Sequence, residues 1–109
     1  MAWIDALFQR MVHEGASDLH MTSGTQPMFR LHGEMCFVSD CPVITAEQMQ
    51  NILFEITPDN NRKQFQDEND TDFAYELPGQ ARFRANLFRD RKGIGAVFRQ
   101  IPTEILSAE

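Results

Sequence analysis

The sequence predicts an α+β domain in which helices cover one mostly antiparallel sheet of about six strands. Apolar side chains recur at helical spacing in the first fourteen residues, and a helix-capping pattern begins near residue 45. From residue 73 onward, apolar and polar side chains alternate, as they do along half-buried strands. The chain has 109 residues, of which 42% are hydrophobic, so it fits one domain with one core.

The first third of the chain is predicted to form one helix and then three strands. The helix covers residues 2–14 and ends near Gly15. A short strand follows at 18–22, and residues 28–32 and 35–38 form two more, joined by a glycine turn. The predicted apolar face of the helix consists of Trp3, Ile4, Leu7, Phe8 and Met11.

The middle of the chain is predicted to form two helices. Thr45 and Gln48 have the spacing of a capping box, which opens the first of them. Thr57 is predicted to cap the second, with Pro58 at its first helical position. That helix runs to about residue 68 and has little apolar surface beyond Phe65. The predicted core face of the first helix consists of Met49, Ile52, Leu53 and Ile56.

Three strands are predicted to complete the sheet. Residues 73–77 place two aromatic side chains and a leucine on one face, and a Pro-Gly turn follows. Residues 81–88 and 94–101 form a hairpin around a short connection at 89–93. The predicted element order is therefore α-β-β-β-α-α-β-β-β, an α+β arrangement that is broadly PAS-like.

Charge is distributed unevenly along the chain. The net charge is −6, yet residues 80–100 carry +5 and the rest of the chain carries −11. The overall charge and the absence of an RNA-reader pattern of aromatics argue against nucleic-acid binding, although the basic hairpin keeps that alternative testable. The cations of this segment are Arg82, Arg84, Arg89, Arg91, Lys92 and Arg99.

The predicted hairpin gathers three of these arginines on one face of the sheet. Side chains alternate along a strand, so Arg82 and Arg84 point away from the apolar face. If residue 89 pairs with residue 94, Arg84 lies opposite Arg99; a shift of two residues brings Arg82 there instead. Directly opposed like charges destabilise a sheet.

Two interpretations of this basic face remain open. Arginine binds phosphate oxygens in pairs and keeps its charge at any relevant pH, so an anion between the arginines would explain the arrangement. The other interpretation is a solvated basic face, paired in part with the acidic residues 67–72. The pattern by itself favours the solvated face.

Other candidate sites are weaker. Asp18 and His20 lie two residues apart on a predicted strand, but no third metal ligand accompanies them, which favours a local structural hydrogen bond. Cys36 and Cys41 lack partner ligands and are expected to be structural, reduced thiols. No metal site is predicted.

Catalysis and membrane insertion are not expected of this chain. No G-x-x-x-x-G-K-[ST] phosphate loop occurs, and neither Lys63 nor Lys92 follows such a loop, so we expect no ATP hydrolysis by the chain alone and no catalytic residue in it. Apolar runs are too short to cross a bilayer and no secretory signal is visible, which makes the cytoplasm the default location.

Three stretches of the chain resemble sequence motifs of one known protein family. Gly15-Ala-Ser-Asp-Leu-His20 resembles the family's "ASDLH" signature, and Pro27-Met-Phe-Arg-Leu-His-Gly33 resembles its "PPxxRxxG" segment. Residues 71–86, continuing at 95–102, resemble its "TDFSFEVPGxARFRVNxF…GAVFRxIP" block. The family that the chain resembles is the bacterial PilT-type pilus retraction ATPases, of the secretion ATPase superfamily. The resemblance covers essentially the whole chain and is least distinctive at residues 36–66.

The resemblance implies a domain of a ring-shaped motor. Such a subunit has a PAS-like N-terminal domain, here residues 1–102, then a linker, here starting at 103–109, and a RecA-like ATPase domain absent from this chain. Six subunits form a ring in the cytoplasm at the inner-membrane base of the type IV pilus, next to the platform protein. ATP and Mg in the intact protein drive pilus disassembly and twitching motility, through motion of the N-terminal domains against the RecA-like domains of their own and neighbouring subunits.

The resemblance also assigns roles to individual residues. It places Arg84 and Arg99 against the nucleotide phosphates, and Ser17, Asp18 and His20 in the family motif. Because the turn at 89–92 is more charged than the family's amide-rich turn, the resemblance leaves open which subunit contacts this turn makes.

The short segment before the Ser-Asp-Leu-His motif argues against extension motors, and the accessory PilU-like relatives rank second within the family. A free-standing PAS-like sensor or adaptor for a small anion or a partner protein is the alternative. Possible supporting or subunit-interface residues are Arg82, Arg89, Arg91 and Lys92.

Overall fold

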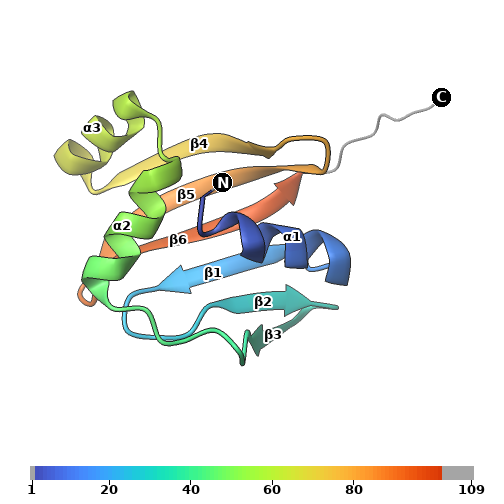
Figure 1. The fold of residues 1–109 in the computed structure, drawn as a ribbon. Coiled ribbons are helices and arrows are strands. Elements are labelled where there is room, and N and C mark those ends of the chain that lie inside the picture. The colour runs from blue at the N-terminus through green and yellow to red at the C-terminus, as the bar shows by residue number, and fades with distance from the viewer. Residues whose placement is uncertain (1, 102–109) are drawn as a thin grey trace.

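A computed structural model describes residues 2–101 of the chain, and the predicted element order is confirmed (Figure 1). The predicted linker at 103–109 lies outside the described residues. No helix among residues 2–101 is long and apolar enough to span a membrane. The elements are α1 (Asp5–Glu14), β1 (Asp18–Thr22), β2 (Met28–Leu31), β3 (Glu34–Phe37), α2 (Ala46–Ile56), α3 (Asp59–Glu68), β4 (Asp70–Leu77), β5 (Ala81–Asp90) and β6 (Gly93–Ile101).

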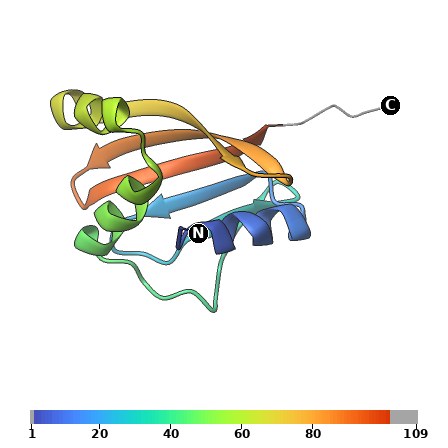
Figure 2. The same ribbon diagram turned by 45° about the horizontal axis from the view of Figure 1, so that its top comes forward.

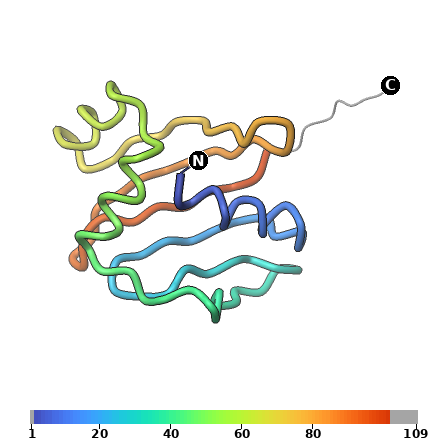
Figure 3. The backbone as a smooth tube through the Cα atoms, viewed as in Figure 1, coloured from blue at the N-terminus to red at the C-terminus, as the bar shows by residue number. Residues whose placement is uncertain are grey.

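The six strands form one antiparallel sheet in the order β3-β2-β1-β6-β5-β4. The first and last strands of the chain therefore lie side by side in its centre, as the backbone tube shows (Figure 3). Helices α1 and α2 lie on the same face of the sheet, and α3 packs beside β4 (Figure 2). Among the described residues no helix covers the opposite face, which we call the uncovered face.

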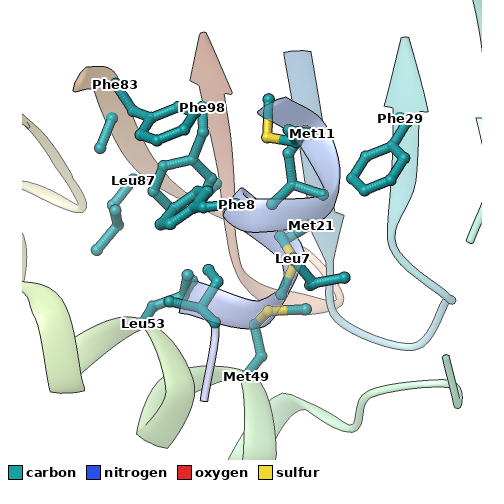
Figure 4. Close-up of a cluster of buried hydrophobic side chains, with 14 of the residues drawn as sticks. Leu7, Phe8, Met11, Met21, Phe29, Met49, Leu53, Phe83, Leu87 and Phe98 are labelled. Atoms are coloured by element: carbon teal, nitrogen blue, oxygen red, sulfur yellow. The ribbon is translucent and has the colours of Figure 1, made fainter. Parts of the chain in front are cut away.

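The core lies between the sheet and helices α1 and α2, and Phe8 of α1 stands at its centre (Figure 4). Its ring stacks on Phe83 with centroids 4.4 Å apart and meets Phe98 edge-on at 5.0 Å.

The predicted core faces of α1 and α2 each included residues that the structure leaves partly exposed. Helix α1 begins only at Asp5, so Trp3 precedes it and is 45% exposed. In α2, Met49 and Leu53 are fully buried while Ile52 and Ile56 are half-buried, because one narrow stripe of α2 faces the core.

The predicted cap of α3 is wrong. Thr57 ends α2: its hydroxyl donates to the Leu53 carbonyl at 2.6 Å and its amide to the Phe54 carbonyl at 3.3 Å. With its side chain engaged by the preceding helix, Thr57 cannot cap the next one. Pro58 is the N-cap residue instead, and α3 begins at Asp59.

The hairpin turn is tighter than predicted. Strand pairing continues to Asp90 and Gly93, so Arg91 and Lys92 alone form the turn. The Asp90 carboxylate accepts hydrogen bonds from the Lys92 and Gly93 amides at 2.8 and 3.2 Å. Gly93 has a φ of 131°, which a glycine adopts at little cost. These contacts fix the register of β5 against β6.

Removing the central ring should strongly destabilise the domain. Phe8→Ala leaves a cavity among Phe83, Phe98 and Tyr75, and we expect a loss of about 3–5 kcal/mol in the free energy of unfolding, measured by chemical denaturation. Trp3→Ala is the control, because that side chain is large but 45% exposed and should cost much less. Equal losses in the two variants would contradict this account of the core.

A buried polar contact joins α1 to β4. The Tyr75 hydroxyl donates to Asp5 Oδ1 at 2.6 Å, and Asp5 is only 6% exposed. Burial and the bond to Asp5 both raise the pKa of Tyr75, so the phenol stays protonated and remains a donor. The pair anchors the start of α1 over the edge of the sheet.

Deleting this hydroxyl should destabilise the domain through its partner. Tyr75→Phe keeps the ring but leaves the Asp5 carboxylate short of a donor, which should cost about 1–3 kcal/mol of unfolding free energy. A double-mutant cycle with Asp5→Ala isolates the contact, because Tyr75→Phe should then cost little more. Additive losses around the cycle would show that the hydrogen bond does not matter.

Candidate functional site

A row of charged side chains crosses the uncovered face of the sheet. Cross-strand pairing places Arg30 of β2 opposite Asp18 of β1, Asp18 opposite Arg99 of β6, and Arg99 opposite Arg84 of β5. Directly paired residues on neighbouring strands point to the same side of a sheet, so all four side chains share one face. We call them the charged row; its signs run cation, anion, cation, cation.

The register confirms the first of the two predicted pairings of the hairpin. Arg89 pairs with Ile94 and Arg84 with Arg99, while Arg82 pairs with Ile101 on one side and Glu76 on the other. The two arginines that the family resemblance assigned to the phosphates are therefore direct cross-strand neighbours. Arg82 shares their face but lies at the next outward position.

Asp18 is the most tightly held member of the charged row. It is 3% exposed and accepts hydrogen bonds from the Ser17 hydroxyl at 2.6 Å and from Arg99 Nε at 3.1 Å, while Arg30 Nε lies 3.8 Å away. Burial opposes ionisation, but these donors and cations together hold the pKa of Asp18 below its ordinary value. Asp18 is therefore a carboxylate at neutral pH.

The two opposed arginines differ in how they are held. Arg99 is tied to Asp18 through Nε, although its side chain remains 73% exposed. The Arg84 side chain makes no hydrogen bond and no ion pair within residues 2–101. Together they border a shallow surface hollow whose lining also includes Asp72, Asn86 and Val97.

The acidic residues of β4 do not neutralise Arg84 by direct contact. Asp70 and Asp72 each accept a hydrogen bond from the Asn86 side chain, at 3.1 and 2.8 Å. Within residues 2–101, no carboxylate lies within ion-pair distance of Arg84. The predicted pairing of the basic face with the acidic patch is thus replaced by an amide contact, and of the two arginines that line the hollow only Arg99 has a carboxylate within ion-pair distance among residues 2–101.

The remaining cations of the hairpin do not join the charged row. Arg89 lies on the helix-covered face, where its guanidinium stacks over Phe65 at 5.0 Å and its Nε donates to Asn69 at 3.0 Å. Arg91 and Lys92 form the exposed turn at the far end of the two strands. These cations are close together in the sequence, but the fold divides them between the two faces of the sheet and the turn of the hairpin.

His20 shares the uncovered face with Asp18 but does not bond to it. It lies opposite Met28 and Val97, and burial lowers its pKa. Within the described range, Asp18 bonds to Ser17 and Arg99, and the bond from the adjacent Ser17 is a local structural hydrogen bond of the kind expected. The described residues contain no group of three or more potential metal ligands.

Sequence reasoning missed Arg30 and the contact between Asp18 and Arg99. Arg30 and Asp18 both belong to family motifs: Arg30 is the arginine of the second motif, and Asp18 is the aspartate of the first. The motifs lie far apart along the chain, and only the pairing of β1 with both β2 and β6 brings them together.

Comparison with known proteins agrees with these motifs, although no protein-family model matches the chain. The chain is 42% identical over 96 residues to the "Type IV pilus retractation ATPase PilT" of Pseudomonas aeruginosa, which covers 88% of this chain and 28% of that protein. A "Twitching motility protein" of Neisseria gonorrhoeae is 42% identical over 83 residues, covering 76% of this chain and 22% of that one.

Structural comparison gives the same result. The crystal structure of the pilus retraction motor PilT with bound ADP superposes with a TM-score of 0.85 at 30% identity, over 97% of this chain and 31% of that one. The chain spans less than a third of the length of each of these relatives. In motifs and in fold, the chain is a homologue of the N-terminal domain of PilT-type proteins.

Proposed function

We propose that this chain acts as the N-terminal domain of a hexameric pilus retraction motor and contributes Arg84 and Arg99 to the ATP phosphates. The observation that carries the proposal is the opposed arginine pair, which borders an open hollow without a directly contacting carboxylate on Arg84. Like charges in direct opposition cost stability. A ligand with several anionic oxygens would turn that cost into binding, because guanidinium forks match phosphate oxygens.

The nucleotide itself would be held by a RecA-like domain joined to this one through a linker that starts at residues 103–109. ATP and Mg would bind there, since this chain contains no phosphate loop. The PilT neighbour with bound ADP supports nucleotide use by such an assembly. This domain would then move as a rigid body, in the cytoplasm at the inner-membrane base of the pilus, against RecA-like domains of its own and neighbouring subunits and near the platform protein.

The arginine pair would couple ATP to domain closure. A γ-phosphate in the cleft gives both guanidinium groups a shared anion, and each charge-assisted bond contributes about 1.5–3 kcal/mol. Two such bonds shift a two-state equilibrium by about two to four orders of magnitude. Hydrolysis removes the anchor, so the cleft opens and the domain swings back.

The free-standing sensor or adaptor remains the second candidate, because it would use the same uncovered face to bind a small anion. The two functions differ in what the isolated domain binds. A motor domain meets the phosphates only when the cleft closes, so ATP and inorganic phosphate should bind the isolated domain weakly. Micromolar binding of inorganic phosphate in calorimetry would favour the sensor.

Loss of either arginine should slow ATP turnover in a protein where this domain is joined to its ATPase domain. We expect Arg84→Gln and Arg99→Gln to lower turnover by about 10- to 100-fold, the equivalent of one or two charge-assisted bonds, with the thermal midpoint little changed. Arg82→Gln is the comparison variant, because Arg82 lies on the same face opposite Glu76 and Ile101 and should change turnover much less.

Two results would count against this assignment. Unchanged turnover in both variants would remove the arginines from the nucleotide site. A loss of turnover that tracks a loss of thermal stability would indicate a structural role for the pair.

A further inference from the structure

The contacts of Asp18 explain how an exposed arginine is kept in place. The Ser17 amide donates to the Arg30 carbonyl and the Gln100 amide to the Ser17 carbonyl, each at 3.0 Å, so the backbone beside Asp18 is tied to both neighbouring strands. The Ser17 hydroxyl donates to Asp18 Oδ1, which leaves Oδ2 for Arg99 Nε. Both oxygens of this buried carboxylate thus have fixed directions.

Arg99 is held at only one of its donor nitrogens. A guanidinium group has five N–H donors, and Asp18 takes the one on Nε. The two terminal nitrogens make no hydrogen bond within residues 2–101, and Arg99 lines the hollow beside Arg84. Because phosphate recognition uses such terminal pairs, the Asp18 contact orients Arg99 without occupying the atoms that would bind the ligand.

Orientation matters here because Arg99 is otherwise free. Its side chain is 73% exposed, and a long exposed side chain loses rotamer freedom when a ligand fixes it. A contact that already fixes it removes part of that loss before the ligand arrives. Arg30, whose Nε lies 3.8 Å from Asp18, is beyond hydrogen-bond distance, so Arg99 is the arginine that Asp18 bonds directly.

We propose that Asp18 is a positioning residue that presents the terminal nitrogens of Arg99 to the phosphates of a bound nucleotide. This inference rests on the proposed function. A purely electrostatic role for Asp18 predicts the opposite effect of its removal: loss of a negative charge beside the arginine pair would strengthen binding of an anion. A positioning role predicts slower ATP turnover, although the site becomes more positive.

The test is a double-mutant cycle in a protein that joins this domain to its ATPase domain. Asp18→Asn should lower kcat about tenfold, roughly the value of one charge-assisted hydrogen bond, with little change in KM for ATP. Asp18→Glu, which keeps the carboxylate, should recover part of the loss. In an Arg99→Gln background, Asp18→Asn should have no further effect, because the group that Asp18 positions is gone.

Controls separate positioning from folding. Asp70→Asn makes the same chemical change on the same face, where the carboxylate contacts Asn86 and no arginine, and should leave kcat within about twofold. Ser17→Ala removes one hydrogen bond to Asp18 but keeps the carboxylate, so this variant replaces Asp18→Asn in the test if Asp18→Asn does not fold. It should lower kcat about two- to threefold, and only when Arg99 is present.

The outcomes distinguish this inference from the proposed function. Full turnover in Arg99→Gln would refute the proposed function, and the role of Asp18 would fall with it. Loss in Arg99→Gln but full turnover in Asp18→Asn would overturn the positioning role alone. An equal loss from Asp18→Asn in both backgrounds, or tighter ATP binding in Asp18→Asn, would also overturn it.

Discussion

The pairing of β1 with β6 is the constraint on which the rest of the structure depends. It joins the first strand of the chain to the last and sets the two faces of the sheet at once. Leu19 and Phe98 meet on the inner face as part of the core, while Asp18 and Arg99 meet on the uncovered face. Because strand side chains alternate, a slip of one residue would send the core residues outward and the charges inward. The burial of the core therefore also fixes the contacts of the charged row.

The two faces of the sheet differ in role: the inner face stabilises the domain, and the uncovered face leaves charged side chains accessible. Helices α1 and α2 bury the inner face around Phe8, and that packing supplies the stability that the uncovered face does not. On the uncovered face, Arg84 and Arg99 oppose each other, which local pairing preferences disfavour. Conflicts of this kind between local preference and overall fold are expected at functional sites. Asp18 limits the conflict to one uncompensated cation, since it binds Arg99 and leaves Arg84 without a counterion among the described residues.

The same arrangement suits a domain that acts on a ligand held elsewhere. The chain corresponds to under a third of its PilT-type relatives, and no phosphate loop occurs in it. The hollow beside the arginine pair is open to solvent, which is the geometry that the proposed contact with a nucleotide held by another domain requires. The acidic remainder of the chain keeps the overall charge negative, at −6.

The sequence by itself determined the elements and the local pairing, and the tertiary structure decided the contacts between distant segments. Helical spacing, the capping box at Thr45 and strand alternation predicted the element order. The short hairpin connection left two registers, with either Arg84 or Arg82 opposite Arg99. Prediction from the pattern failed where one side chain has two possible partners, as at Thr57, whose hydroxyl bonds to α2 and does not cap α3. It also failed at the joining of Asp18 to Arg99, because these residues are 81 positions apart and no periodicity relates segments at that separation. Such contacts arise only when the core selects one arrangement of strands.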